Sequence, residues 1–580
     1  MGFVEEELAQ MWADLLEVTG APVGLESRFA GLGGGADEAG RLAARIDEDL
    51  GVRVAAAELL RADTLEGMAR LVRDTMGRTA GRCDPVGGTL ASPLAAVREE
   101  RPQLSFAQQR LWFMQQIDPG TTLYNVPTVL RLRGTLDRAA LGRALDALVA
   151  RHEVLRTTYA APSGRPHQVI ADPAPGELPY TDLSGAADPA GEAERVAADE
   201  AARPFDLAAG PPLRARLVRV APDDHRLLVT FHHVAVDGWS VEILFRELGQ
   251  LYGGEPPAEV TLHYAEYASW QRDRLRGETL DALVDHWRRA LGEDPKALAV
   301  PTDKPRPATR GFRGAVATRE LGPELISAVK EFSRRERVTP YMTLFAALHT
   351  LLAGWSGERD ITVGTPVAGR NRPELQDLVG CLMNMVPVRV RLEDDLGFRE
   401  LLTRVRTAVL DASAHQELPF DKLVEALVSR RARDFLPVFR VMFSFLKEQP
   451  EPVFAGLGRC TLDLAGPQDT AKYDLSLYAQ ERGAGLALTL EYDTDLFGPD
   501  TPAALLAAFE RTLAQAVARP GIPVGELGAA ARFTTGSAPA PAPGPTTGSE
   551  SGPPGPGTTP RPGTASGPAS GTERNLHRDR

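Results

Sequence analysis

The spacing of apolar residues in the first 80 residues predicts a small helical bundle. Two sets of apolar residues recur three or four positions apart, one before and one after a glycine-rich turn: Leu8, Met11, Trp12 and Leu15, then Leu42, Ile46 and Leu50. This spacing places an apolar stripe on one face of each helix. We expect residues 1–80 to form a compact helical unit.

From about residue 104 the pattern alternates between strand-like and helix-like stretches. Alternate residues of the run 125–133 are apolar or β-branched, and the apolar residues that follow at 141, 145 and 148 lie on one helix face. The β-prone run 227–231 precedes a second amphipathic helix, which begins near Ser240. The pattern predicts a mixed α/β fold for residues 104–531.

Two stretches break the periodic pattern. Glycines and prolines interrupt it at 81–103, which we interpret as a linker. Residues 534–571 are almost entirely Gly, Pro, Ser, Thr and Ala, and such a composition cannot repay the entropy of ordering. We therefore expect a disordered tail at 532–580.

Composition narrows the function classes. A net charge of -13 argues against a nucleic-acid binder, and no stretch has the ~20 apolar residues that a membrane-spanning helix needs. The acidic start lacks a basic and then apolar leader, so we expect a cytoplasmic protein. The three cysteines form no CxxC pair, and no GxGxxG or GxxxxGK[ST] motif occurs. We expect neither a metal site nor a nucleotide site.

The loop 232–240, HHVAVDGWS, is the strongest candidate for chemistry. A neutral imidazole can orient an amine or hydroxyl, or accept its proton, near pH 7. Because neighbouring side chains of a strand point to opposite faces, His232 and His233 cannot share a role. One of them should face a cavity and the other should be packed.

The string HHxxxDG at 232–238 resembles the active-site motif of nonribosomal peptide synthetase condensation domains, within the chloramphenicol acetyltransferase-like superfamily. Further stretches resemble the family's other motifs in the same order: LSFAQQRLWFM at 104–114, RHEVLRT at 151–157, YAEYASWQ at 264–271, VGTPVAGR at 363–370, LVGCLMNMVPVR at 378–389, HQELPF at 415–420, PVFRVMF at 437–443 and KYDLSL at 472–477.

This resemblance implies an α/β fold of two similar lobes set in a V around a central tunnel, with an N-lobe at about 104–275 and a C-lobe at about 276–531. Two partner carrier proteins dock at opposite mouths and deliver substrates on phosphopantetheine arms. The acceptor amine attacks the donor thioester and forms an amide. The sequence does not exclude a hydroxyl acceptor, which would give an ester instead. The family requires no metal and no nucleotide.

The resemblance also assigns roles to residues. His233 faces the tunnel and positions the amine, accepts its proton, or stabilises the tetrahedral intermediate; the sequence does not separate these roles. Asp237 forms an ion pair with an arginine, for which Arg156 is the expected partner. Gly238 either lets its N–H approach a substrate oxyanion or serves a tight turn. We expect structural roles for the remaining histidines and tryptophans of the motifs: His232, His152, His415, Trp112, Trp239 and Trp270.

Residues 29–42, FAGLGGGADEAGRL, resemble a peptidyl carrier domain with a changed attachment site. Gly35 and Ala36 stand where the family has an acidic residue and the serine that receives phosphopantetheine. Alanine offers no nucleophile, so this degenerate unit should carry no substrate, and both carriers should come from other chains. The sequence leaves open whether Ala36 is natural or engineered.

Two other functions compete with condensation. Epimerisation domains share HHxxxDG but usually continue differently from Trp239-Ser240, and heterocyclisation domains replace both histidines by aspartates. A catalytically silent recruitment platform is the alternative outside catalysis. Such degenerate domains typically lose the second histidine or the glycine, and both are present here as His233 and Gly238.

Overall fold

The computed structural model describes residues 3–16, 23–50, 52, 54–79, 99–162, 164–307, 309–428, 436, 438–463 and 469–530. The tail expected at 532–580 lies outside the described residues, as does the expected linker up to residue 98. Across the described ranges, no helix combines the length and apolar character needed to cross a membrane.

The N-terminal unit is the helical bundle that the apolar spacing predicts. Its elements are α1 (Phe3–Leu15), η1 (Ala30–Leu32), α2 (Ala36–Leu50), α3 (Ala56–Ala62) and α4 (Leu65–Thr79). The predicted stripe residues Leu8, Trp12, Leu42 and Ile46 are fully buried in one apolar cluster. Trp12 packs edge-to-face on Phe29, with ring centroids 4.9 Å apart. The aromatic pair therefore joins α1 to the turn before α2.

The first lobe is built on a five-stranded sheet with the order β11-β1-β6-β5-β4. Its strands are β1 (Asn125–Arg133), β4 (Tyr180–Asp182), β5 (Leu213–Ala221), β6 (Asp224–His232) and β11 (Thr461–Asp463). The accompanying elements are α5 (Phe106–Ile117), α6 (Arg138–Arg151), η2 (Glu153–Arg156), β2 (Thr157–Ala160), β3 (His167–Ile170), α7 (Pro189–Ala201), α8 (Gly238–Tyr252) and α9 (Tyr264–Arg274). The antiparallel register of β1 and β6 pairs Asn125 with His232.

The second lobe is built on a six-stranded mixed sheet with the order β7-β13-β12-β10-β8-β9, in which β10 is parallel to β8 and β12. Its strands are β7 (Gly314–Leu321), β8 (Asp360–Val367), β9 (Asn384–Arg391), β10 (Val441–Leu446), β12 (Leu475–Arg482) and β13 (Gly485–Asp493). Its helices are α10 (Glu278–Leu291), α11 (Pro323–Glu336), α12 (Pro340–Ser356), η3 (Pro373–Leu375), α13 (Phe398–Ala414), α14 (Phe420–Leu427), α15 (Asp500–Ala518) and α16 (Val524–Ala530).

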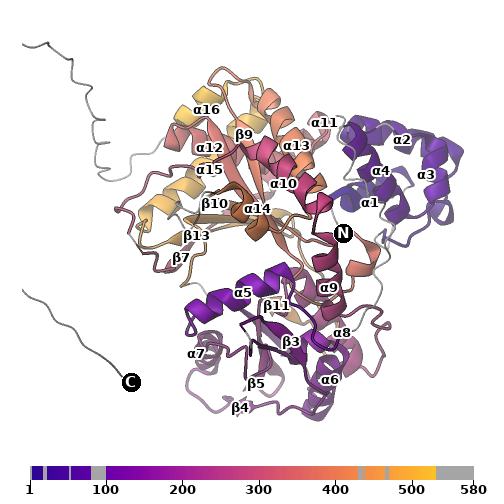
Figure 1. Cartoon of the computed structure of the whole chain (residues 1–580). Helices are drawn as coiled ribbons and strands as arrows, with labels where there is room; N and C mark the ends of the chain where they lie inside the picture. Colours follow the sequence, from indigo (N-terminus) through magenta and orange to yellow (C-terminus); the bar gives the residue numbers. More distant parts are fainter. Residues whose placement is uncertain are drawn as a thin grey trace, which may run out of the picture. The chain divides into compact units, whose positions relative to one another are not determined.

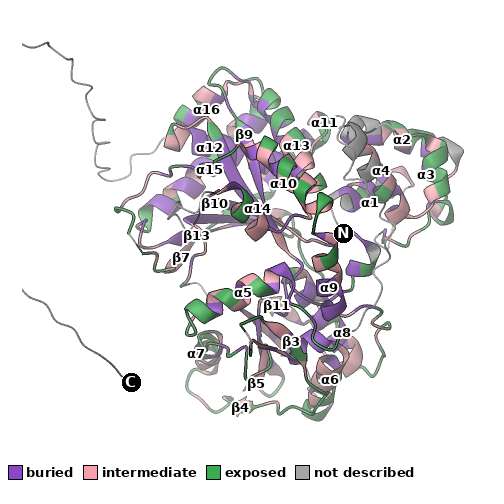
Figure 2. Ribbon diagram, viewed as in Figure 1, coloured by how far each residue is buried: buried purple, intermediate pink, exposed green. Residues whose placement is uncertain are grey.

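Helix α12 is the central helix of the second lobe. Every residue from 342 to 353 is buried, so the helix is covered on all sides (Figure 2). Thr339 caps its N-terminus by accepting from Met342 N, and Pro340 occupies the first turn, where no amide donor is required. Gly357 ends the helix in the left-handed region, at φ 79°. The two sheets and their helices confirm the predicted α/β class.

The first lobe contains segments from beyond residue 275, where we expected it to end. Strand β11, at Thr461–Asp463, pairs with β1 and completes the sheet of the first lobe (Figure 1). A second late segment also packs into the first lobe's core through buried apolar side chains: Leu375, Leu378, Val379, Cys381 and Leu382. Two segments of the later sequence therefore belong structurally to the first lobe.

Candidate active site

The HHxxxDG loop connects the last residue of β6 to the first residue of α8. His233 N donates to Tyr124 O at 2.8 Å, which holds the loop against the residue before β1. Asp237 is the N-cap of α8, and its carboxylate accepts from Ser240 N at 2.9 Å. A capped helix start and a paired strand end thus fix both ends of a short loop.

The two adjacent histidines lie in different surroundings, as strand alternation predicts. His232 is 2% exposed, and its Nδ1 accepts from Val234 N at 3.0 Å. Burial lowers the pKa of His232 to about 3, so its ring is neutral. His233 instead lines a large cavity together with Tyr124, Gly238 and Lys472.

His233 is held neutral by its surroundings. Burial lowers its pKa to about 4, the nearby positive charge of Lys472 adds to this effect, and Asp237 opposes it. The Sγ atom of Cys381 lies 3.6 Å from His233 Nδ1. Burial raises the pKa of Cys381 to about 12, so a protonated thiol contacts this edge of the imidazole.

Asp237 is saturated with hydrogen bonds. Its Oδ1 accepts from Ser240 N at 2.9 Å, Ser240 Oγ at 2.8 Å and Arg370 Nη2 at 3.0 Å. Its Oδ2 accepts from Arg370 Nη1 at 2.8 Å, Leu382 N at 2.9 Å and Met383 N at 3.1 Å. Burial alone would raise the pKa of Asp237, but the charge and hydrogen bonds of Arg370 hold it below its usual range. Every acceptor position of this carboxylate is therefore occupied.

The expectation that Arg156 pairs with Asp237 is wrong, because Arg370 occupies that position. Arg156 ends η2, where it lies 3.8 Å from Glu153 and donates to the main-chain carbonyls of Ala150 and Ala171. Arg156 lies in the RHEVLRT motif and Arg370 in the VGTPVAGR motif. Their positions along the chain do not show which of the two contacts the HHxxxDG loop. The signal for Arg370 is its position at the end of the VGTPVAGR stretch.

Ser240 extends the contact between the loop and the second half of the chain. Its Oγ accepts from Arg370 Nη2 at 2.9 Å and from Gly380 N at 3.0 Å, and its proton can reach Asp237 Oδ1 or Gly380 O, each at 2.8 Å. Sequence reasoning did not assign Ser240 this role. The segment from Arg370 to Met383 is thereby bound to the N-terminus of α8.

The backbone at Gly238 does not support the tight turn, one of the two reasons considered for this glycine. Its φ is not positive, and a Cβ added there would meet no atom within 4 Å. The turn therefore does not require glycine. Gly238 lies on the cavity wall as the first residue of α8, where the helix dipole favours negative charge.

Lys472 was not identified as a candidate site residue from the sequence. It lies on the cavity wall, with Nζ 5.1 Å from the centre of the Tyr124 ring, and burial lowers its pKa. Arg110 also reaches the wall and lies 3.7 Å from Asp421. The cavity around His233 therefore contains fixed charges as well as apolar residues.

The chain matches the condensation domain family over residues 98–535, and residues 6–72 match the phosphopantetheine attachment site family. The chain belongs to the condensation domain family. Malpinin synthetase of Mortierella alpina is 37% identical over 86% of the chain, and phosphinothricin tripeptide synthetase PhsC of Streptomyces viridochromogenes is 40% identical over 69%. The chain spans 6% and 37% of the lengths of these two relatives.

Solved condensation-type structures share the fold. The X-domain from teicoplanin biosynthesis is 29% identical with a TM-score of 0.68, covering 74% of this chain and 98% of that one. The SgcC5 protein from Streptomyces globisporus is 30% identical with a TM-score of 0.61, covering 73% of this chain and 100% of that one. These likenesses confirm the chloramphenicol acetyltransferase-like fold that the motifs imply.

The phosphopantetheine attachment family implies a serine at the start of the second helix of the N-terminal unit. Here α2 begins at Ala36, so the position where a serine would stand holds a methyl side chain. A Cβ at Gly34 would lie 2.3 Å from the Phe29 ring, so the glycine turn is packed as the fold requires. Ser27 does not substitute, since its Oγ accepts from Gly24 N at 2.9 Å within its own turn. The unit therefore keeps the packing of its glycine turn and has an alanine at the start of α2.

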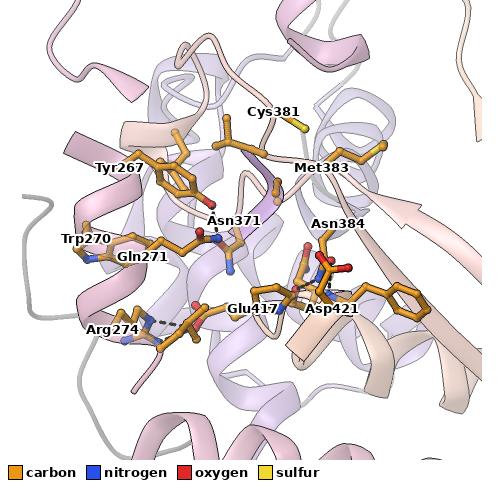
Figure 3. Close-up of a pocket in the computed structure, with 18 of the residues that line it drawn as sticks. Tyr267, Trp270, Gln271, Arg274, Asn371, Cys381, Met383, Asn384, Glu417 and Asp421 are labelled. Carbon is orange, nitrogen blue, oxygen red and sulfur yellow. Dashed lines mark hydrogen bonds and ion pairs between the residues drawn. The ribbon is translucent and has the colours of Figure 1, made fainter. Parts of the chain in front are cut away.

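A second pocket of the condensation domain lies beside α9 (Figure 3). Two residues that line this pocket, Arg274 and Glu417, form an ion pair with Nη2 and Oε2 2.9 Å apart. Asn384 Nδ2 donates to the carbonyls of Gln416 and Leu418 at 2.9 and 2.7 Å. Cys381 lines this pocket as well as contacting His233. The loop 415–420 is thus fastened to the start of β9.

The residues expected to be structural are packed or hydrogen-bonded. His152 is 3% exposed, and its Nε2 lies 2.8 Å from Glu247. The Nδ1 atom of His415 lies 2.8 Å from the carbonyl of Asp411. Three tryptophans pack half-buried against the core of the first lobe: Trp112, Trp239 and Trp270. Trp239 Nε1 donates to Gln376 O at 2.9 Å, which adds another contact across the α8 N-terminus.

Proposed function

We propose that this condensation domain joins a carrier-bound donor acyl thioester to a carrier-bound acceptor amine, with an amide as the product. The observation that carries this proposal is the neutral imidazole of His233 on the cavity wall, next to the open space at Gly238. The amine nitrogen bonds to the thioester carbonyl carbon, the carbon–sulfur bond breaks, and the amine proton leaves with the thiol. A hydroxyl acceptor would give an ester by the same balance.

Positioning supplies much of the acceleration in this proposal. A thioester is already activated, and an amine with a pKa near 8 is partly neutral at pH 7, so holding the two together is effective. In this proposal His233 Nδ1–H donates to the sulfur of Cys381, so the lone pair of the neutral ring lies on Nε2, which can accept a hydrogen bond from the amine. Because the pKa of His233 is about 4, the ring stores a proton poorly and acts mainly by orienting the amine.

The N-terminus of α8 is the candidate site for the oxyanion of the tetrahedral intermediate. Gly238 is the first residue of this helix and carries no Cβ that would keep a substrate oxygen away from the main chain. Asp237 takes no part in proton transfer, since its oxygens are fully engaged by Arg370, Ser240 and two main-chain amides. Its role is to hold the loop in place.

Both phosphopantetheine arms come from carriers other than the N-terminal unit. The absence of a hydroxyl at Ala36 supports this part of the proposal, since a phosphopantetheinyl arm is attached through a side-chain oxygen. The unit keeps the packing of a carrier, including the Phe29 and Gly34 contact. We propose that carrier proteins on other chains deliver both substrates to the condensation domain.

A recruitment platform is the second candidate function. The observation in its favour is the likeness to the teicoplanin X-domain, which has been solved in complex with OxyB. The presence of His233 on an open cavity favours catalysis instead. We find nothing in the loop that favours epimerisation.

A transfer assay with separately loaded donor and acceptor carriers tests the proposal. Product on the acceptor carrier, formed with the full chain and lost with His233→Ala, would support condensation. Equal amounts of product with and without the chain would overturn it and favour the platform. Heat-inactivated chain is the control for uncatalysed aminolysis.

A further inference from the structure

Lys472 brings a positive charge to the wall of the cavity that holds His233. It comes just before β12, the strand that pairs with β10 and β13 in the sheet of the second lobe. Its Nζ lies 5.1 Å from the centre of the Tyr124 ring, within the range of a cation–π contact. Tyr124 O also accepts from His233 N at 2.8 Å. Lys472 and His233 therefore both contact Tyr124, a residue of the first lobe.

Two other cations on this cavity wall have acidic partners, whereas Lys472 has none. Arg370 binds Asp237 through both terminal nitrogens, and Arg110 lies 3.7 Å from Asp421. In the part of the chain that the structure describes, Nζ of Lys472 forms no ion pair and no hydrogen bond. A partly buried cation without a counter-charge costs free energy. Lys472 is therefore available to a negative charge on a bound substrate.

The charge of Lys472 acts on the groups around the reaction site. It adds to the effect of burial in lowering the pKa of His233 and of His232. Burial also lowers the pKa of Lys472 itself, and the negative charge of Glu491 opposes this shift and favours the ammonium form. A charge that shifts both imidazoles also acts on atoms bound beside them, because the Coulomb interaction is strong in a poorly solvated site.

Three groups of the tetrahedral intermediate need a partner in the proposed reaction: the amine, the oxyanion and the sulfur. His233 orients the amine, and the α8 N-terminus at Gly238 is the candidate site for the oxyanion. The sulfur gains negative charge as the carbon–sulfur bond breaks, and the neutral ring of His233 does not balance this charge. An unpaired ammonium on the same cavity wall can balance it.

We propose that Lys472 is a catalytic residue whose ammonium stabilises the negative charge on the sulfur of the donor thioester as the carbon–sulfur bond breaks. The amine nitrogen bonds to the carbonyl carbon, the sulfur leaves with the electron pair of the broken bond, and the proton that the amine nitrogen releases ends on the sulfur. Lys472 keeps its own protons throughout. This inference rests on the proposed condensation function and adds a residue of the second lobe to a site whose His233 and Gly238 belong to the first.

Two donors with different leaving groups test this role in single-turnover transfer assays on the full chain, with one carrier-bound acceptor amine. One donor is an N-acetylcysteamine thioester. The other carries the same acyl group on thiophenol, whose thiolate is the weaker base and needs less stabilisation. Lys472→Met should slow transfer from the alkyl thioester by about 10² and that from the phenyl thioester by less than about threefold. Rates measured without the chain are subtracted from both.

Lys304→Met is the matched control for the loss of a lysine. Lys304 is exposed and its Nζ donates to Thr494 O at 2.7 Å, so this variant should transfer from both donors as the unchanged chain does. The Tm of Lys472→Met should not fall, because the substitution removes a cation that has no acidic partner. Its transfer from the phenyl thioester shows in addition that the site is intact.

An equal loss of rate with both donors would overturn the proposal, because it would mean that Lys472 acts on binding or on the shape of the cavity. Normal transfer from the alkyl thioester by Lys472→Met would also overturn it. In both of these cases, transfer by the unchanged chain would still support condensation. Failure of the unchanged chain to transfer from either donor would instead overturn the proposed function together with this inference.

Discussion

Arg370 binds Asp237 through both terminal nitrogens, at 2.8 and 3.0 Å, and neither side chain is more than 3% exposed. The two residues are 133 positions apart in the sequence. The loop that carries His233 therefore takes its shape from a residue of the second half of the chain. A buried ion pair of this kind is costly to break from one side, because the other charge stays buried.

Replacing either residue of this ion pair should destabilise the folded chain. Asp237→Ala and Arg370→Ala should each lower the free energy of unfolding by about 3 to 5 kcal/mol. Arg156→Ala is the control and should cost about 1 kcal/mol, since Arg156 loses only contacts with Glu153 and two carbonyls. Denaturant unfolding of the three variants measures this. A larger loss for Arg156→Ala than for Arg370→Ala would contradict the assigned partner.

Substitution of His233 should affect mainly activity, and substitution of His232 should affect mainly stability. His233→Ala should lower the single-turnover transfer rate by about 10² to 10³ while leaving the Tm nearly unchanged, because the ring lines a cavity. His232→Ala should lower stability by about 2 kcal/mol or more, because it removes a buried ring. Thermal melts and transfer assays on both variants test the split. Near-normal transfer by His233→Ala would show that positioning by the cavity alone suffices.

Stability should fall as the pH drops below about 6.5. The pKa of His232 is about 3 in the folded chain and about 6.5 when unfolded, so between these values the unfolded chain binds a proton that the folded chain excludes. By pH 5 this histidine alone should cost about 2 kcal/mol. His233 and His349, each with a pKa of about 4, act in the same direction.

Denaturant unfolding between pH 5 and pH 7 measures this dependence. His232→Gln removes one titrating group, so its stability should vary less steeply with pH than that of the unchanged chain. Carboxylates such as Asp237, whose pKa is lowered, lose their contribution only at lower pH. Identical slopes for the two proteins would mean that His232 titrates normally in the folded chain.

The N-terminal unit should resist phosphopantetheinylation. Incubation with coenzyme A and a phosphopantetheinyl transferase should leave the mass of the unchanged chain as it was, because Ala36 has no hydroxyl. Ala36→Ser restores a nucleophile at the start of α2 and should gain one phosphopantetheine if the surrounding surface is still recognised. Intact-mass measurement reads both results. A gain localised to residues 1–80 of the unchanged chain would contradict the assignment of the attachment position.

Features set by near neighbours in the sequence could be predicted, and features set by distant contacts could not. The stripe of Leu8 and Trp12 marked a helix, and strand alternation placed His232 and His233 on different sides. The partner of Asp237 was assigned wrongly, because both Arg156 and Arg370 fit the sequence and only folding decides between them. The charge of Lys472 near His233 is likewise a contact between distant segments.

The pairing of β11 with β1 has a consequence for synthesis on the ribosome. Val129, Leu130 and Arg131 of β1 pair with residues 461–463, so the first lobe cannot complete its sheet until translation has passed residue 463 and the segment has left the exit tunnel. Until then one edge of β1 is open, and an open strand edge invites pairing with other chains. After β6 ends at His232, more than 200 further residues must therefore be synthesised before Thr461 begins β11, and one edge of β1 stays unpaired during that time.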